Sequence, residues 1–466
     1  MNIKKYKHNS SPAPAGSSST KHMNLFSTID GLKPYILQAL DDLHFKSMTP
    51  IQELSIREIL QDKDIIAKAK TGSGKTLAFI IPTLNKIDIS KRVPQALIIV
   101  PTRELCMQIV AVAREMTKYS ENFKIVSLYG GVKLYEQTTY MQSGTHIIVA
   151  TPGRLKDHLD RGNVDLSLIK TLILDEADKM LDMGFYDEIV SLIKRLEKKR
   201  QTLLFSATLP EKVLKLADTI LKDPLLLAVD TTQENIQESF MVSSNLKEDI
   251  LKVILYKSPS KAILFCNTKE ETYEIEELLK THNISCALLN GDLDQISRNE
   301  ALIQLANGSA RILVATDIAS RGLDVDDIDM VLNYKLPDKK EVYTHRIGRS
   351  ARAEKSGEAI SLFFKSQKAF FELLSENHSE LKIDGNKFAS KLPSANKTFV
   401  ISAGKRDKMS PKDILGALIK DAGIAYENIG DITIHEHRSY VAIKNGTKVP
   451  HGNLKIKGKN RKIWTI

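Results

Sequence analysis

Two short segments combine residue types that suit nucleoside triphosphate chemistry. The first reads Ala69-Lys70-Thr71-Gly72-Ser73-Gly74-Lys75-Thr76 and lies between a short β-branched run and an apolar helical pattern. It fits the phosphate-loop template except at its first position, where Ala69 replaces Gly. Backbone N–H groups at the glycines can surround phosphate oxygens, Lys75 can neutralise the terminal phosphates, and Thr76 can offer a hydroxyl to Mg²⁺. The segment predicts nucleoside triphosphate binding.

The second segment places carboxylates at the end of a strand. The run Leu172 to Leu174 predicts a buried strand, and Asp175-Glu176-Ala177-Asp178 follows it directly. One acid can hold the magnesium shell and a second can orient and deprotonate an attacking water. Alone, the quartet could equally be the acidic first turn of a helix. Beside phosphates, adjacent carboxylates require a divalent ion, so the two segments together predict Mg²⁺ as a cofactor.

The elements that must position these residues repeat along the chain. Apolar, β-branched runs alternate with helical stretches, which is typical of parallel sheets covered on both faces. The runs are Ile65 to Ala67, Ala96 to Val100, Lys124 to Leu128, Ile147 to Ala150, Leu172 to Leu174 and Leu203 to Phe205, then Ala262 to Phe265, Cys286 to Leu289, Ile312 to Ala315, Met330 to Asn333 and Ala359 to Phe363. The pattern predicts two consecutive α/β domains whose motifs lie at the carboxyl ends of strands.

A chain of 466 residues is too long for one core, and three domains are expected. Residues 1–23 are polar and rich in Pro and Ser, which predicts a disordered extension. The other predicted parts are a first α/β domain at 24–228, a linker at 229–239, a second α/β domain at 240–384, a linker at 385–396 and a terminal domain at 397–466.

Positive charge is concentrated in the terminal domain. From Lys397 to Ile466 there are 14 Lys and Arg against 6 Asp and Glu, a balance of +8 out of a total of +10. This predicts contact with a polyanion, although a solvated basic surface is the alternative. Apolar runs are too short for a bilayer, no secretory signal pattern is present, and the three cysteines lack zinc or disulfide spacing. A reduced, cytoplasmic protein without a membrane partner is expected.

The order of motifs from Phe26 to Phe364 resembles the core of the DEAD-box family of RNA helicases, which implies two tandem RecA-like domains. Thr49-Pro50-Ile51-Gln52 resembles the Q motif, although His44 stands where the family usually has glycine. The resemblance implies ATP contacts from Phe26, Gln52, the phosphate loop and Asp324. It implies catalytic roles for Glu176, Lys75, Asp175, Arg349 and Arg352, metal binding by Thr76 and Asp175, and coupling of hydrolysis to strand separation by Asp178, Ser206, Thr208 and His345.

The resemblance also implies a path for single-stranded RNA across both domains. Its residues are Pro101, Thr102, Arg103, Gly130, Gly131, Thr151, Pro152, Gly153 and Arg154 in the first domain and Thr316 and Asp317 in the second. Arginines, hydroxyls and glycine amides suit phosphate and 2′-OH groups and carry little base information. Taken separately each motif is weak, and Thr-Pro-Gly is usually only a turn.

The terminal domain resembles an RNA-recognition-motif fold of the bacterial DbpA subfamily, a small α+β domain. Strands are expected at Thr398 to Ser402, Asp431 to His435, Tyr440 to Ile443 and Lys462 to Ile466, with a helix at Lys412 to Ile419. The stretch His437 to Ile443, where such a fold usually presents several stacking aromatics, offers only Tyr440, which favours phosphate contacts over base stacking across the sheet. Expected RNA contacts are Lys405, Arg406, Lys408, Tyr440, Lys455, Lys457 and Lys459, against the alternative of a basic tail with no specificity.

The resemblance implies an ATP-dependent RNA helicase that the terminal domain directs to 23S ribosomal RNA in large-subunit assembly. It implies ATP and Mg²⁺ as cofactors, RNA as the partner, and a monomer without an obligate protein partner. One alternative is a binding platform that clamps RNA and hydrolyses ATP slowly. A DNA helicase is a further option that the motifs disfavour.

Overall fold

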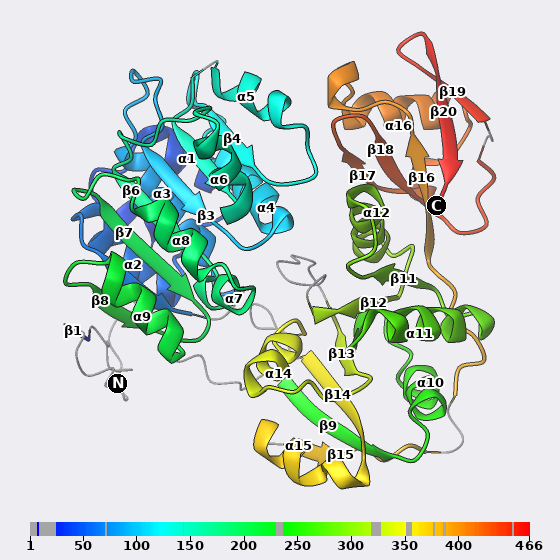
Figure 1. Ribbon diagram of the computed structural model, residues 1–466. Coiled ribbons are helices and arrows are strands. Elements are labelled where there is room, and N and C mark those ends of the chain that lie inside the picture. Colours follow the sequence, from blue (N-terminus) through cyan, green and yellow to red (C-terminus); the bar gives the residue numbers. More distant parts are fainter. Residues whose placement is uncertain are drawn as a thin grey trace, which may run out of the picture. The chain divides into compact units, whose positions relative to one another are not determined.

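The computed structural model describes residues 7–8, 25–69, 72–142, 144–229, 236–317, 328–350, 357–375, 378–384, 388–449 and 452–466. These residues form two compact units, one with the elements up to β8 and one with those from β9 onward (Figure 1). Within the described ranges, no helix has both the length and the apolar character that crossing a membrane requires.

The first unit is built on a parallel sheet with the strand order β1-β8-β2-β7-β6-β3-β5-β4. Its strands are β1 (Lys7–His8), β2 (Ile65–Lys68), β3 (Ala96–Ile99), β4 (Ile125–Leu128), β5 (Ile147–Ala150), β6 (Thr171–Leu174), β7 (Gln201–Ser206) and β8 (Leu225–Ala228). The six strand runs predicted for this domain are all present. The sequence analysis missed β8. It also missed β1, which lies inside the predicted extension and pairs with β8 through Lys7 and His8.

Helices cover both faces of this sheet, as buried parallel strands require. They are α1 (Pro34–Asp42), α2 (Pro50–Leu60), α3 (Lys75–Lys86), α4 (Arg103–Met116), α5 (Leu134–Gln142), α6 (Pro152–Asp160), α7 (Ala177–Asp182), α8 (Tyr186–Ile193) and α9 (Glu211–Ile220). Alternate residues of β3 separate the two cores. Ile98 packs with α1 to α4, while Leu97 and Ile99 pack with α6 to α9.

The second unit begins with a parallel sheet of order β11-β12-β10-β13-β14-β9-β15. Its elements are β9 (Ile236–Ser243), α10 (Leu246–Lys257), β10 (Ala262–Cys266), α11 (Lys269–Thr281), β11 (Cys286–Leu289), α12 (Gln295–Ala306), β12 (Ile312–Thr316), β13 (Met330–Asn333), α14 (Lys340–Ile347), β14 (Gly357–Phe364), α15 (Lys368–Leu374) and β15 (His378–Glu380). Strand β9 begins inside the range 229–239 that was predicted as a linker. Its polar residues hid it in the sequence, but β9 pairs with β14 along its whole length.

The C-terminal domain is an antiparallel sheet of order β17-β18-β16-β20-β19 with α16 (Pro411–Lys420) on one face. The strands are β16 (Asn396–Ile401), β17 (Ile429–Ile434), β18 (Ser439–Lys444), β19 (Gly452–Ile456) and β20 (Lys459–Thr465). The sequence predicted four of these and missed β19. Lys457 and Gly458 have φ angles of 51° and 76°, which a two-residue hairpin turn between β19 and β20 requires. The expected basic tail is therefore a β-hairpin.

Candidate ATP and RNA site

The phosphate loop follows β2 and leads into α3. Gly72 and Gly74 have φ angles of 84° and 87°, a left-handed conformation that favours glycine. A Cβ at Gly74 would lie 2.5 Å from Gln52 Nε2, so the position also lacks room for a side chain. Ala69 directly follows the strand and donates its N–H to the Ser206 carbonyl at 3.0 Å. Lys70 and Thr71 lie outside the described residues.

Gln52 is hydrogen-bonded to the phosphate loop. Its Nε2 donates to the Gly74 carbonyl at 3.0 Å, and its Oε1 accepts from the Thr49 N–H at 2.8 Å. Thr49 Oγ1 donates to the Ser73 carbonyl at 2.8 Å. An amide has two N–H donors and two acceptor lone pairs, so one of each remains for an adenine edge. Gln52, the predicted adenine contact, is thus also hydrogen-bonded to the phosphate loop.

Two other expectations about this region met different outcomes. His44 has φ 59°, so the position where the family usually has glycine does adopt the left-handed backbone, at the end of α1. Phe26, which was expected to stack on the base, is only 3% exposed and belongs to the core beside α1 and α2. Burial leaves little of its ring for a ligand in this conformation.

Lys75 and Asp175 present opposite charges in a buried setting. Lys75 is 7% exposed, and its Nζ has no hydrogen-bond partner among the described residues. A buried ammonium needs an anion as its partner, and a terminal phosphate of the nucleotide would supply one. Burial raises the pKa of Asp175 to about 6, although the charge of Lys75 opposes this. Thr76 and Asp175 are oxygen donors of the kind that Mg²⁺ prefers, so the site fits a phosphate-bound magnesium ion.

Glu176 occupies the turn between β6 and α7. Its φ of 54° is left-handed, which is unusual for a residue with a side chain and typical of a strained functional site. Its Oε1 pairs with Lys179 Nζ at 2.5 Å, and both side chains are buried. The sequence analysis missed Lys179. Its signal is the spacing of three residues, which places it one helical turn after Glu176.

Asp178 joins the acidic quartet to the motif after β7. Its Oδ2 accepts hydrogen bonds from the N–H and the Oγ1 of Thr208, both at 2.8 Å. Ser206 Oγ accepts from the Asp178 N–H at 3.2 Å and donates to the Thr208 carbonyl at 2.7 Å. The structure therefore brings Asp178 together with Ser206 and Thr208, which lie 28 and 30 positions further along the sequence.

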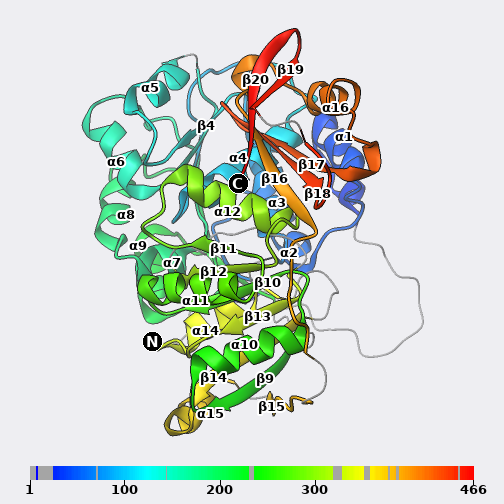
Figure 2. The same cartoon turned by 90° about the vertical axis from the view of Figure 1, so that its right-hand side faces the viewer.

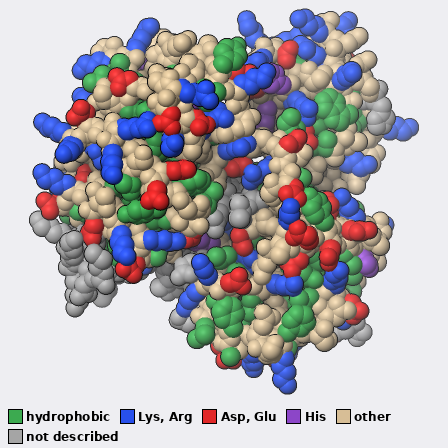
Figure 3. Space-filling view, viewed as in Figure 1, with side chains coloured by type: hydrophobic (Ala, Val, Ile, Leu, Met, Phe, Trp, Pro, Cys, Tyr) green, Lys and Arg blue, Asp and Glu red, His purple; other side chains and the backbone are tan. Residues whose placement is uncertain are grey.

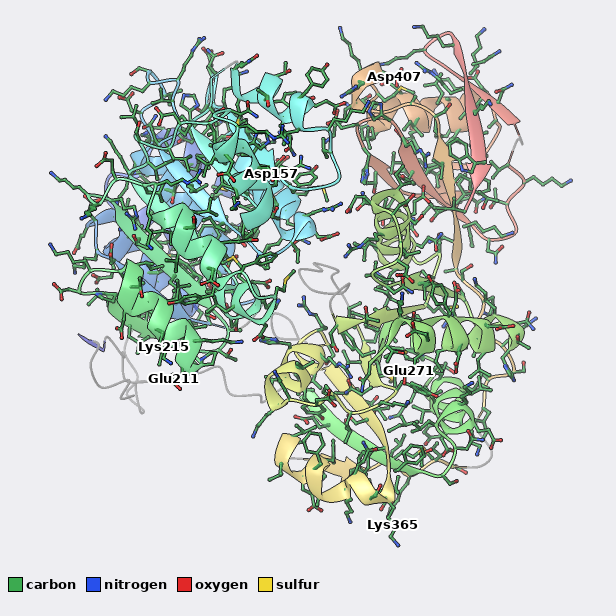
Figure 4. The ribbon with its side chains drawn as sticks, in the orientation of Figure 1. Asp157, Glu211, Lys215, Glu271, Lys365 and Asp407 are labelled. Atoms are coloured by element: carbon green, nitrogen blue, oxygen red, sulfur yellow. The ribbon has the colours of Figure 1, made fainter. Side chains whose placement is uncertain are left out.

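Three loops of the predicted RNA path meet where β3, β5 and β4 end. Gly131 has φ 84°, and a Cβ there would lie 2.2 Å from Arg103 NH1, so the guanidinium packs directly on this glycine. Arg154 NH1 donates to the Val132 carbonyl at 2.8 Å and to Gln137 Oε1 at 2.9 Å. Asp157, on the same helix as Arg154, is labelled in Figure 4.

The remaining first-unit residues of this path shape its loops. Thr102 precedes α4 and accepts the Leu105 N–H at 3.3 Å, and Thr151 precedes α6. Pro101 lies in the loop before α4, Gly130 lies in the turn after β4, and Pro152 and Gly153 are the first two residues of α6. Gln137, which the sequence analysis missed, is buried and also donates to the Tyr129 carbonyl at 3.0 Å.

Arg346 joins several segments of the second unit through its hydrogen bonds. It binds Asp317 through two hydrogen bonds of 2.7 Å and donates at 2.7 to 3.2 Å in all five of its hydrogen bonds. The side chain is buried, and its guanidinium lies 5.2 Å from the centre of the Phe265 ring. Arg346 therefore does not lie on a solvated helix face. Asp317 was expected on RNA, and its carboxylate is bound to this arginine.

The other second-unit residues are placed singly. Arg349 follows α14 and is buried, His345 lies on α14 and is half-buried, and Thr316 ends β12. Asp324 and Arg352, also predicted for the ATP site, lie outside the described residues.

In the C-terminal domain, the predicted basic residues lie on one hairpin and one turn. Lys405, Arg406, Lys408, Lys455, Lys457 and Lys459 are all exposed. Lys457 Nζ donates to the Lys408 carbonyl at 2.6 Å and pairs with Asp413 at 2.8 Å, which joins the hairpin to the turn. Asp407, labelled in Figure 4, pairs with Arg461 at 2.9 Å. Figure 3 shows Lys and Arg side chains around the outer edge of this domain.

Tyr440 does not lie with these residues. It is 3% exposed, and its hydroxyl donates to Glu300 on α12 at 3.3 Å. A ring without an open face cannot stack on a base, so this position speaks against the predicted RNA contact.

Comparisons with known proteins agree on the family. Residues 49–216 match the DEAD/DEAH box helicase family, 245–354 match the helicase conserved C-terminal domain, and 398–463 match the DbpA RNA binding domain. The chain is 41% identical to ATP-dependent RNA helicase DbpA of Escherichia coli over 95% of this chain and 99% of the relative. It is 34% identical to the Bacillus subtilis protein of that name, over 92% and 96%.

Two solved structures of RNA-bound proteins have a similar fold. Mss116p bound to ssRNA and AMP-PNP matches 81% of this chain and 83% of its own, with a TM-score of 0.71 and 30% identity. S. cerevisiae Dbp5 bound to RNA and ADP BeF3 matches 75% and 94%, with a TM-score of 0.69 and 27% identity.

Proposed function

The chain belongs to the DEAD-box ATP-dependent RNA helicases of the DbpA type, and on this basis we propose that its C-terminal domain directs it to 23S ribosomal RNA during large-subunit assembly. The observation that carries the proposal is the single basic surface formed by the turn at Lys405–Lys408 and the β19–β20 hairpin. Clustered lysines suit a folded RNA with closely spaced phosphates.

We assign the chemistry of ATP hydrolysis to residues of the phosphate loop and the acidic quartet in the first unit and to two arginines of the second unit. Lys75 holds the terminal phosphates with its buried ammonium, and Glu176 orients and deprotonates the attacking water. Arg349 and Arg352 stabilise charge on the transferred phosphoryl group, for which a planar guanidinium is suited. Mg²⁺ bound by Asp175 and Thr76 would neutralise charge on the phosphate oxygens.

Coupling to RNA is assigned to the bonded group of Asp178, Ser206 and Thr208. A change at the acidic quartet reaches β7 through these hydrogen bonds, and the RNA-gripping loops end neighbouring strands of the same sheet. The protein is proposed to act in the cytoplasm as a monomer, without an obligate protein partner.

The basic surface is tested by reversing two of its charges in the full chain. With Lys405→Glu and Lys408→Glu together, half-maximal ATPase stimulation should require at least about tenfold more ribosomal RNA hairpin, because two phosphate contacts become repulsive. The matched control is Lys420→Glu with Lys444→Glu, which changes the net charge equally elsewhere in the domain. An equal loss in both variants, or an equal response to an unrelated hairpin, would refute ribosomal RNA targeting by this surface.

A clamp that binds RNA and turns over slowly is the second candidate. The buried Lys179–Glu176 pair favours it, because a carboxylate neutralised by a lysine is a weaker base. Multiple-turnover unwinding of a short duplex supports the helicase, and stoichiometric ATP-dependent retention of RNA supports the clamp.

A further inference from the structure

The sheet of the C-terminal domain has a second face, opposite α16. Strand residues alternate between faces, so Phe399 and Val441 pack against α16 while Val400 and Tyr440 point the other way. Val400 is paired with Tyr440 on one side and with Trp464 on the other. These three side chains form one row across β18, β16 and β20. In an RNA-recognition motif, such a row usually offers its side chains to RNA bases.

This second face is covered in the present chain. Thr398 and Val400 are 0% exposed, and Ala442 is 1% exposed, although none of them belongs to the domain's own core cluster. Helix α12 packs against β16, and Figures 1 and 2 both show α12 beside the sheet. A free sheet face would expose these residues to water. The covering element is therefore a helix of the preceding α/β domain.

Buried hydrogen bonds join the two domains at one end of this contact. Asn307, directly after α12, donates from Nδ2 to Thr398 Oγ1 at 2.9 Å, and Thr398 Oγ1 donates to Ser309 Oγ at 2.8 Å. Asn396 Nδ2 donates to the Asn307 carbonyl at 2.7 Å. Buried polar groups that satisfy one another fix a single arrangement, because any slip would leave them without partners.

A charged pair joins the domains at the other end. Glu300 on α12 accepts from Arg438 NH1 at 3.1 Å and from the Tyr440 hydroxyl at 3.3 Å. Burial and the charge of Glu300 raise the pKa of Tyr440 to about 12. Arg438 also lies over the Trp464 ring, 5.7 Å from its centre. The Glu300 carboxylate therefore binds Arg438 and Tyr440, the two side chains that the sheet could otherwise offer to RNA.

We propose that the sheet face of the C-terminal domain is an intramolecular docking surface for α12, locked by Glu300, and that RNA is bound by the basic turn and hairpin instead. This contact between α12 and the sheet, called the joint below, holds the C-terminal domain at a fixed orientation on the second α/β domain. Only the RNA half of this inference rests on the proposed function.

Docking is tested without RNA through the reactivity of a buried thiol. Val400→Cys places a probe in the covered face, in a chain that also carries Cys286→Ser. Glu300→Lys should raise its labelling rate at least about tenfold, because like charges then face each other at Arg438. Combining Glu300→Lys with Arg438→Glu should return the rate toward that of the parent. Glu276→Lys on α11, whose carboxylate pairs only within its own helix, is the matched control.

Buried Cys106 and Cys266 report whether the two α/β domains stay folded. Slow labelling of both in every variant shows that only the joint has opened. A probe at position 400 that reacts rapidly in the parent chain, or equally slowly with Glu300→Lys, would overturn the docking.

The RNA half is tested by locking the joint. Ser309→Cys with Thr398→Cys puts two sulfur atoms where oxygens are 2.8 Å apart, which suits a disulfide. The oxidised chain should bind a ribosomal RNA hairpin with a Kd within about twofold of the reduced chain. A loss of tenfold or more that a reductant reverses would show that RNA needs the sheet face. A reduced chain without preference for the ribosomal hairpin would refute the proposed targeting, while the labelling result still decides the docking.

Discussion

At the scale of single residues, Glu176 is held in a conformation that its surroundings must maintain. Its left-handed φ of 54° costs about 1 to 2 kcal/mol for a residue with a side chain. The Asp175 carboxylate accepts its N–H at 2.9 Å, and Lys179 binds its carboxylate. The turn presents the Glu176 side chain at the end of β6, and these contacts offset the free-energy cost of its backbone conformation.

Glu176→Gln removes the proposed base and keeps the shape of the side chain. We expect turnover of ATP to fall at least about 100-fold, while ATP and RNA affinities stay within a few-fold of the parent. Steady-state ATPase rates and equilibrium binding measure the two effects. Glu197→Gln, at an exposed loop position, should change neither. Near-normal ATPase in Glu176→Gln would mean that another group activates the water.

Arg346→Lys tests the buried guanidinium. Lysine has three donors on a point charge and cannot reproduce the planar two-bond contact with Asp317. We expect a loss of about 3 kcal/mol in the free energy of unfolding of the second unit, measured by urea titration. The exposed Arg195→Lys, which pairs with Asp160, should cost less than about 1 kcal/mol. Equal costs would mean that burial adds nothing to this contact.

At the scale of elements, hydrogen bonds between Asp178 and Thr208 join α7 to the segment after β7. Thr208→Val keeps the shape of the side chain and removes only the hydroxyl that donates to Asp178. We expect RNA-stimulated ATPase to change less than about threefold, while duplexes separated per ATP hydrolysed fall at least about tenfold. A parallel decline of both activities would place Thr208 in the hydrolysis step instead of the coupling.

The RNA loops allow a comparison between two glycines. Gly131 and Gly162 both have a positive φ, but only a Cβ at Gly131 meets a neighbour, at 2.2 Å from Arg103. Each substitution by Ala should destabilise the fold by about 1 kcal/mol. Only Gly131→Ala should displace the guanidinium, so only this variant should need at least about fivefold more RNA for half-maximal ATPase. Similar RNA requirements in both variants would separate Arg103 from RNA binding.

At the scale of the whole molecule, charge is distributed unevenly, and affinity for RNA should reflect this. We expect the logarithm of affinity for a ribosomal hairpin to fall linearly with the logarithm of salt concentration. Lys405→Glu with Lys408→Glu should reduce the magnitude of that slope by about 2. Lys420→Glu with Lys444→Glu should leave the slope unchanged. An unchanged slope in the first variant would remove its lysines from the phosphate contacts.

The ATP chemistry was largely readable from the sequence. Phosphate loops and acidic strand ends are local patterns, because a few consecutive residues place backbone amides or carboxylates at the end of one strand. Gly72, Gly74, Lys75 and the quartet therefore needed no knowledge of distant contacts. Most of the parallel strands were visible as well, since continuous apolar runs identify strands that are buried on both faces, but β1, β8, β9 and β15 were missed.

Tertiary structure decided what depends on contacts between distant segments. The first half of β9 is mostly polar and was assigned to a linker, and its pairing with β14 and β15 makes it part of the strand. Tyr440 has the residue type of an RNA contact, and only the burial of its ring against α12 assigns it elsewhere. A side chain's chemistry is local, whereas its exposure depends on what the rest of the chain packs against it. The sequence alone therefore determined which reaction the protein can perform, and the fold decided which basic and aromatic side chains of the C-terminal domain are exposed.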